Sequence, residues 1–292
     1  MMTTLIFLAA YFVHFGNAGS PCPPKADMDP WFCINTPSSH QDTYTSVICN
    51  RPGCENHLDR VDGVTDHMML DRVIISDVNT SESLMLPKEW LSVSRVRELE
   101  IRDTPLSRCF LCENPLSGQG YYMNKLVVSN CSLSGHLCTN CPKIGKAVYK
   151  HDRYEKVYQV NGIDMIGLKG LRTLETLDLS FNKLEEVTNT SFPYDLINLK
   201  KLVLSHNVIS EISSKAFTMF RALTTLDLSH NQLQVLRRDV FSVPEFTLKV
   251  LNVRQNSKIT SRVRSEFKNF LKILKQWGKE LKDQEKEKET EN

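Results

Sequence analysis

LETLDLSFNKLEEV at residues 174–187 is followed by LKKLVLSHNVISEI at residues 199–212 and LTTLDLSHNQLQVL at residues 223–236. The three segments align without gaps, and their starts are 25 and 24 residues apart. A fourth copy, LKVLNVRQNSKI, begins at Leu248. All four copies are apolar at positions 1, 4 and 6 and have asparagine at position 9. This constant period predicts a stack of similar structural units.

The pattern inside each copy has a simple physical reading. The Leu-x-Leu core is a short strand whose alternate side chains face inward. One strand cannot bury that face alone, so stacked copies form a parallel sheet over a continuous core. The sharp turn after each strand leaves buried backbone groups, which an asparagine amide can satisfy. The residues expected to form this amide ladder are Asn182, Asn207, Asn231 and Asn256, and the aromatic residues expected to fill the far side are Phe192, Phe217, Phe241 and Phe267.

Weaker copies precede the clear ones and have their first positions at Leu70, Val96 and Met123. Trp90 and Leu116 stand where the later copies have phenylalanine. The distance from Met123 to Leu174 is 51 residues, close to two periods, which favours a degenerate repeat near Tyr149.

From roughly residue 65 to residue 260 the chain resembles the leucine-rich-repeat family, on the apolar positions and the fixed asparagine given above. The resemblance implies an α/β solenoid, a horseshoe with parallel strands on its concave face. Residues 19–64, with Cys-Pro-Pro at 22–24, are similar to the cysteine-rich N-terminal cap of extracellular members. They also resemble caps of secreted arthropod members, including relatives of the non-catalytic subunit of a shrimp luciferase.

The chain begins with features of a secretory signal peptide, predicted over residues 1–18. Residues 5–15 are almost wholly apolar, and Gly16 and Ala18 provide small residues before a cut. No later stretch is apolar for the roughly 18 residues that span a bilayer. The polar C-terminal residues also lack the apolar tail that would predict a lipid anchor. We therefore expect a secreted, extracellular protein, with glycosylation candidates at Asn79, Asn130 and Asn189.

Nine cysteines follow the signal peptide, which predicts disulfides in an oxidising compartment. Two bridges are expected within 22–54 and two within 109–141. In a cytosolic chain, the two Cys-x-x-Cys pairs would predict a zinc site, which is one alternative to disulfides. A redox-active Cys-x-x-Cys pair is a further alternative. Cys131 stands at position 9 and is expected to be a buried, inert thiol, a reactive thiol being the alternative. The disulfide candidates are Cys22, Cys33, Cys49, Cys54, Cys109, Cys112, Cys138 and Cys141.

No catalytic motif is present, so no enzyme activity and no cofactor are expected. The chain contains no Gly-x-Ser-x-Gly elbow, no His-Glu-x-x-His and no phosphate-binding glycine loop. His206 and His230 occupy equivalent positions in adjacent copies and could hold a metal. No third ligand accompanies them, so no metal site is predicted.

Strand side chains at positions 3, 5, 7 and 8 are expected to point off the concave face. This surface mixes charges and has few aromatic residues, which suits a protein partner better than a lipid or a sugar. A formal charge of +2 disfavours a nucleic-acid partner. The binding candidates are Arg72, Glu98, Glu100, Arg102, Lys125, Asp178, Phe181, Lys201, His206, Asp227, His230 and Arg254.

The C-terminal residues predict an amphipathic helix at 261–281, followed by a charged, disordered tail at 282–292. Apolar residues recur there at steps of three and four, with lysines on the other sides. The apolar stripe would cover the open end of the core. The alternative is a basic helix that lies on an anionic membrane surface.

Overall fold

The computed structural model describes residues 20–37, 43–79, 83–141, 143–145, 148–150, 153–155, 158–160, 162–241 and 247–260. The predicted signal peptide, capping helix and charged tail, and Phe267 with them, lie outside the described residues. Within these residues, no helix combines the length and the apolar character that a membrane span requires.

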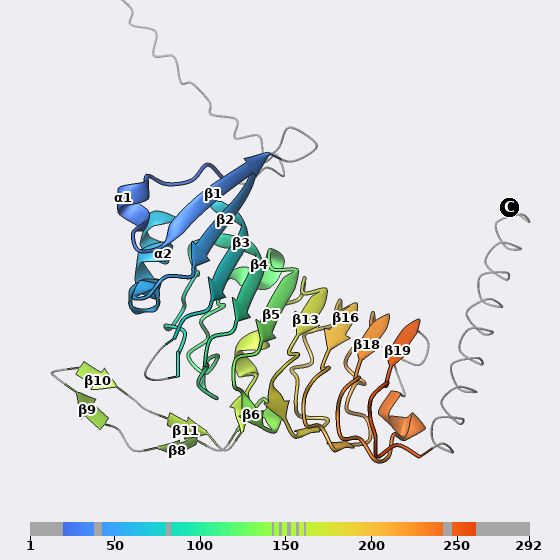
Figure 1. The fold of residues 1–292 in the computed structure, drawn as a ribbon. Helices are drawn as coiled ribbons and strands as arrows, with labels where there is room; N and C mark the ends of the chain where they lie inside the picture. Colours follow the sequence, from blue (N-terminus) through green and yellow to red (C-terminus); the bar gives the residue numbers. More distant parts are fainter. Residues whose placement is uncertain are drawn as a thin grey trace, which may run out of the picture.

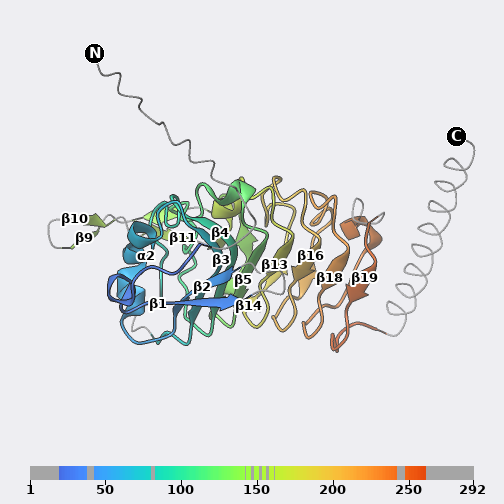
Figure 2. The same cartoon turned by 90° about the horizontal axis from the view of Figure 1, so that it is seen from above.

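One nine-stranded sheet runs the length of the described solenoid (Figure 1; seen from above in Figure 2). Seven of its strands belong to the predicted repeats and run parallel, each hydrogen-bonded to the next coil. They are β3 (Met69–Ser76), β4 (Arg95–Arg102), β5 (Lys125–Ser129), β13 (Thr176–Asp178), β16 (Lys201–Val203), β18 (Thr225–Asp227) and β19 (Val250–Asn252). The molecule is therefore a parallel-strand solenoid.

The core lies between the sheet and the returning segments of the coils. In the first three clear copies the leucines at positions 4 and 6 are buried, as Leu202 and Leu204 show, because alternate strand residues face opposite sides. The phenylalanines of the far side pack in a row, with Phe217 6.2 Å from Phe241 between ring centroids. Trp90 and Leu116 are buried where the weaker copies place them. The returning segments contain the short elements β14 (Lys183–Leu184), β15 (Glu186–Val187), β17 (Glu211–Ile212), η2 (Gln119–Tyr121), η3 (Ile166–Leu168) and η4 (Arg238–Phe241).

The asparagine ladder joins neighbouring coils. The amide of Asn207 donates to the carbonyl of Leu204 in its own coil and to that of Leu179 in the preceding coil, both at 3.1 Å. Its Oδ1 accepts from the backbone N–H of Leu184 at 3.0 Å. Asn182, Asn231 and Asn256 repeat this arrangement. Cys131 continues the ladder, with its thiol 3.3 Å from the carbonyl of Ile101.

An N-terminal cap covers the first coil. It consists of α1 (Lys25–Met28), β1 (Phe32–Pro37), β2 (Thr43–Cys49), η1 (Cys54–His57) and α2 (Leu58–Val64). Strand β1 is antiparallel to β2, and β2 continues the parallel sheet into β3. Trp31 is buried there and donates its indole N–H to the carbonyl of Cys54 at 2.9 Å.

The prediction of a degenerate repeat near Tyr149 is wrong. Strand β13 pairs directly with β5, so no coil lies between them. The intervening residues leave the solenoid as two antiparallel strand pairs, which Figure 1 shows as an arm. The arm contains β8 (Lys143–Gly145), β9 (Val148–Lys150), β10 (Arg153–Glu155) and β11 (Tyr158–Val160). It starts after β7 (Leu137–Cys138) and returns at β12 (Ile163–Asp164), which pair in parallel.

The cysteines form four disulfides and one free thiol, as predicted. Two bridges are in the cap, Cys22–Cys33 and Cys49–Cys54. Two more close the Cys-x-x-Cys pairs, Cys109–Cys112 and Cys138–Cys141. Cys131 is free and buried, and burial raises the pKa of its thiol to about 12. A thiol of that kind is protonated at neutral pH and inert.

Candidate functional site

The outward side of the nine-stranded sheet carries aligned rows of side chains, and we call it the concave face. Parallel register places position 3 of each coil beside position 3 of the next, and position 5 beside position 5. The position 3 row is Arg72, Glu98, Lys125, Thr176, Lys201, Thr225 and Val250, and the position 5 row is Ile74, Glu100, Val127, Asp178, Val203, Asp227 and Asn252.

In the N-terminal half of this face the charged residues bind one another. The carboxylate of Glu100 receives Arg72 Nη2 and Lys125 Nζ at 2.7 Å and Arg102 Nε at 3.1 Å. Lys125 also contacts Glu98 at 3.1 Å. Five predicted binding residues therefore form one ionic network.

Glu100 is the centre of that network and is only 4% exposed. Burial alone raises the pKa of a carboxyl group. Hydrogen bonds from Lys125 and Arg102 and the charge of Arg72 outweigh burial and lower the pKa of Glu100 to about 2. Glu100 is thus a charged structural residue with few free lone pairs for a partner.

Tyr44 of β2 extends the same face toward the cap and is not among the residues predicted from the sequence. Burial raises the pKa of its phenol, and the Glu98 carboxylate raises it further. Tyr44 reaches this face because β2 pairs in parallel with β3. The weak periodicity of the cap gives no sequence signal for that pairing.

A third row lies at position 8, just beyond the strands. Its residues share a left-handed backbone, with φ between 50° and 57° at Asp77, Asp103, Asn130, Phe181, His206, His230 and Gln255. In the six coils from Asp77 to His230, this conformation directs the position 8 N–H to the position 7 carbonyl of the next coil, for example from His206 to Ser229 at 3.0 Å. Asn, Asp and His adopt this region more readily than other L residues, whereas a bulky residue such as Phe181 is an exception.

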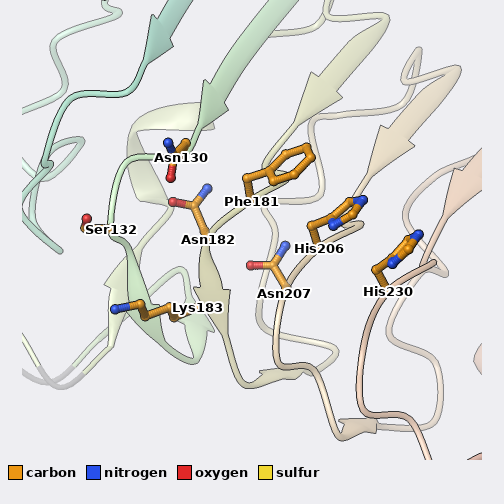
Figure 3. Close-up of a pocket in the computed structure, with 8 residues that line it drawn as sticks. All are labelled: Asn130, Ser132, Phe181, Asn182, Lys183, His206, Asn207 and His230. Atoms are coloured by element: carbon orange, nitrogen blue, oxygen red, sulfur yellow. The ribbon is translucent and has the colours of Figure 1, made fainter. Parts of the chain in front are cut away.

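Three rings of this row form a stack. Phe181 lies 4.1 Å from His206, and His206 lies 4.0 Å from His230, with interplanar angles of 8° and 12°. Figure 3 shows the three rings in one line. Phe181 is 53% exposed. The equivalent positions of His206 and His230 predicted that these two side chains lie side by side, but the stacking of Phe181 on His206 was not predicted.

The stack borders a hollow of about 400 Å³. Asn182 and Asn207 also line it, and their amides are engaged in the ladder (Figure 3). The remaining lining residues are Asn130, Ser132 and Lys183. The hollow therefore joins an exposed aromatic ring to hydroxyl, amide and ammonium groups.

The stacked histidines are poorly placed to share a metal ion. Imidazole lone pairs lie in the ring plane, and a metal binds along them at about 2 Å. Two nearly parallel rings 4.0 Å apart direct their lone pairs side by side rather than at one point. No group of three or more potential metal ligands occurs among the residues that the structure describes.

The other candidates take separate places. Asp178 and Asp227 use a carboxylate oxygen to cap the turn after their own strands, at Ser180 and Ser229. Lys201 is exposed on β16, and Arg254 is exposed beyond β19. The predicted glycosylation candidates Asn79, Asn130 and Asn189 are also exposed. The ring stack, Lys201 and Arg254, rather than the ionic network, are thus the binding candidates that remain open to a partner.

Residues 172–233 match the family model described as "Leucine rich repeat". A human protein, "Leucine-rich repeats and immunoglobulin-like domains protein 1", is 33% identical over 148 residues. That match spans 49% of this chain and 13% of the relative, so the chain corresponds to a small part of that protein. Residues 172–233, which include β13, β16 and β18, are thus similar to leucine-rich repeats and lie within the parallel-strand solenoid.

Solved structures to which the chain shows some similarity include two complexes and a bacterial protein. A TLR13–ssRNA13 complex gives a TM-score of 0.44 at 17% identity, covering 70% of this chain and 27% of that one. The Drosophila Toll–Spatzle complex gives a TM-score of 0.44 at 16% identity, covering 73% of this chain and 24% of that one. An internalin from Listeria monocytogenes gives a TM-score of 0.37 at 17% identity, covering 69% of this chain and 55% of that one. The narrower arthropod resemblance of the cap finds no support in these comparisons.

Proposed function

We propose that this chain is a secreted, non-enzymatic scaffold that recognises an extracellular protein partner on the concave face of its solenoid. The observation that carries the proposal is the continuous sheet face, which is bordered by an exposed ring stack beside a hollow. Interfaces between proteins favour exposed aromatic residues with a polar surround. Four disulfides and three exposed glycosylation candidates support an extracellular setting.

The partner would contact the C-terminal half of the face. The N-terminal charges are already paired, so binding them would first break the Glu100 network. In the C-terminal half, Val250 is 52% exposed and Lys201 is exposed. Binding at the C-terminal half breaks no ion pair within the protein, so it costs less free energy than binding at the Glu100 network.

The experiment is capture of partners from the organism's own extracellular fluid with three proteins. They are the wild type, Val250→Glu on the concave face, and Val235→Glu, a control that is 56% exposed on a returning segment. We expect the wild type and the Val235→Glu control to capture the same partner, and Val250→Glu to fail to capture it. Equal retention by all three would contradict recognition on the concave face.

A further inference from the structure

The position 8 row changes character abruptly between Asn130 and Phe181. These residues lie on neighbouring coils, because β5 pairs directly with β13. The rings of the row end at Phe181, and the next side chain, Asn130, is much smaller (Figure 3). The Asn130 amide is directed at the Asp103 carboxylate, 2.6 Å away. One face of Phe181 therefore stacks on His206 and the other borders the space above Asn130.

Carboxylates stand on the far side of that space. Asp103 occupies the next coil and Asp77 the one after it, and both are exposed. Neither has an ion-pair partner within the part of the chain that the structure describes. The nearby Arg102 is engaged with Glu100. A group stacked on Phe181 would lie about one strand spacing, roughly 4.8 Å, from Asp103.

The backbone at Phe181 gives a second reason to assign a role to its ring. Its φ is 57°, a conformation that costs a bulky L residue free energy. The other six residues of the row are Asp, Asn, His or Gln, which are small or polar. Binding of another molecule by the exposed ring would explain why Phe181 occupies a position where its backbone conformation costs free energy.

We propose that the open face of Phe181 and the carboxylate of Asp103 form a slot that receives an arginine side chain of the protein partner. A guanidinium is planar, always charged and weakly hydrated, and it stacks on aromatic faces. It would continue the stack above Asn130 while the carboxylates balance its charge. The inference rests on the proposed function for the partner being a protein.

Lysine and an aromatic side chain each meet only part of this site. An ammonium group is compact and more strongly hydrated, so it gains less from the ring. An aromatic side chain could stack but would not use Asp103. Lys183, on the hollow, would instead favour an anion, and the experiment includes that outcome.

The test titrates the folded protein with four capped amino acids and measures Kd by NMR. The probes are the acetyl amides of arginine, citrulline, lysine and glutamate, citrulline being planar and neutral. All titrations use a Ser132→Ala background, which removes the acceptor sequence at Asn130, because a sugar there would cover the slot. We expect arginine to bind roughly fivefold more tightly than citrulline or lysine.

Two variants locate the site. Phe181→Asn keeps the left-handed turn, because asparagine adopts it readily, and should weaken arginine binding roughly fivefold. Asp103→Asn should weaken arginine but leave citrulline unchanged. The controls are Tyr194→Asn, at a side chain 72% exposed elsewhere, and Asp239→Asn, an exposed carboxylate on η4; neither should change binding.

Equal binding of arginine and citrulline, tighter binding of glutamate, or unchanged arginine binding by Phe181→Asn would each overturn the slot. The probes need no partner, so the two proposals can fail separately. Arginine selectivity together with a partner that ignores Val250→Glu would refute concave-face recognition alone. Loss of the partner by Val250→Glu without arginine selectivity would refute the slot alone.

Discussion

Each ladder asparagine binds backbone groups of two coils at once, which makes single residues important for the stack. Asn207 satisfies carbonyls of Leu179 and Leu204 and the N–H of Leu184, all within the core. Removing such a side chain leaves buried polar groups without partners, which costs more than the hydrogen bonds gain.

We predict that Asn207→Ala lowers the free energy of unfolding by about 1–3 kcal/mol. Asn198→Ala is the matched control, since that exposed amide makes one hydrogen bond, to the carbonyl of Arg172. Denaturant unfolding of both variants measures the difference. Equal losses would mean that the ladder adds nothing beyond an ordinary surface hydrogen bond.

Glu100 makes the solenoid sensitive to acid. Its pKa is lowered from 4.5 to about 2 in the folded protein, so the folded state favours the carboxylate. The resulting stability is fully present above about pH 5 and is lost as the pH falls toward 2. We predict that Glu100→Gln lowers the free energy of unfolding at pH 7 by up to about 3 kcal/mol.

The measurement is denaturant unfolding of wild type and Glu100→Gln at pH 7, 4 and 2.5. The gap between the two proteins should shrink as the pH falls, because the wild type loses its ionic network. A gap that stays constant over this range would contradict the assignment.

At the scale of elements, the strands were predictable and the turns were not. The Leu-x-Leu spacing identifies β13, β16, β18 and β19, because strand burial has a period of two and repeats with every coil. Parallel stacking then aligns the position 8 residues. Their left-handed backbone accompanies hydrogen bonds to the next coil, which no local pattern encodes. The period thus placed His206 beside His230, whereas the extension of the stack to Phe181 was not predicted.

The arm shows how a period can mislead. A gap of 51 residues fits two coils, but β5 and β13 are neighbours. Within the part of the chain that the structure describes, the inserted strands pair only with one another, β8 with β11 and β9 with β10. The parallel pair β7–β12 closes the solenoid beneath them.

We predict that replacing residues 142–161 with a short Gly-Ser linker changes the free energy of unfolding by less than about 1 kcal/mol. The coil would still close through β7 and β12. Thermal or denaturant unfolding checks this, with a deletion that also removes Leu137 and Ile163 as the control expected to destabilise. Unfolding of the linker variant itself would show that the arm supports the core.

At the scale of the whole molecule, the disulfides divide into two groups, in the cap and beside the arm. Cys109, Cys138 and Cys141 pack together with Cys112 against them. Cys131 stays apart in the ladder, buried and with its thiol pKa raised to about 12. The covalent framework therefore leaves one thiol that only unfolding exposes.

We predict that unreduced protein binds no thiol label when folded and one label per chain in denaturant, at Cys131. Mass spectrometry of the labelled peptides measures both values, and Cys131→Ser should abolish labelling. Labelling at Cys109 or Cys141 after chelation would instead support the zinc alternative.

Recognition on the concave face is the central claim, and a glycan wedge tests it most directly. Lys201→Asn with Val203→Thr introduces an acceptor sequence on β16, and Val235→Asn with Arg237→Thr introduces one on a returning segment. The measurement is the affinity of each glycosylated protein for the captured partner. We predict that the wedge on β16 abolishes binding and the wedge at residue 235 leaves it unchanged. Undiminished binding with the β16 wedge fully occupied would contradict the account.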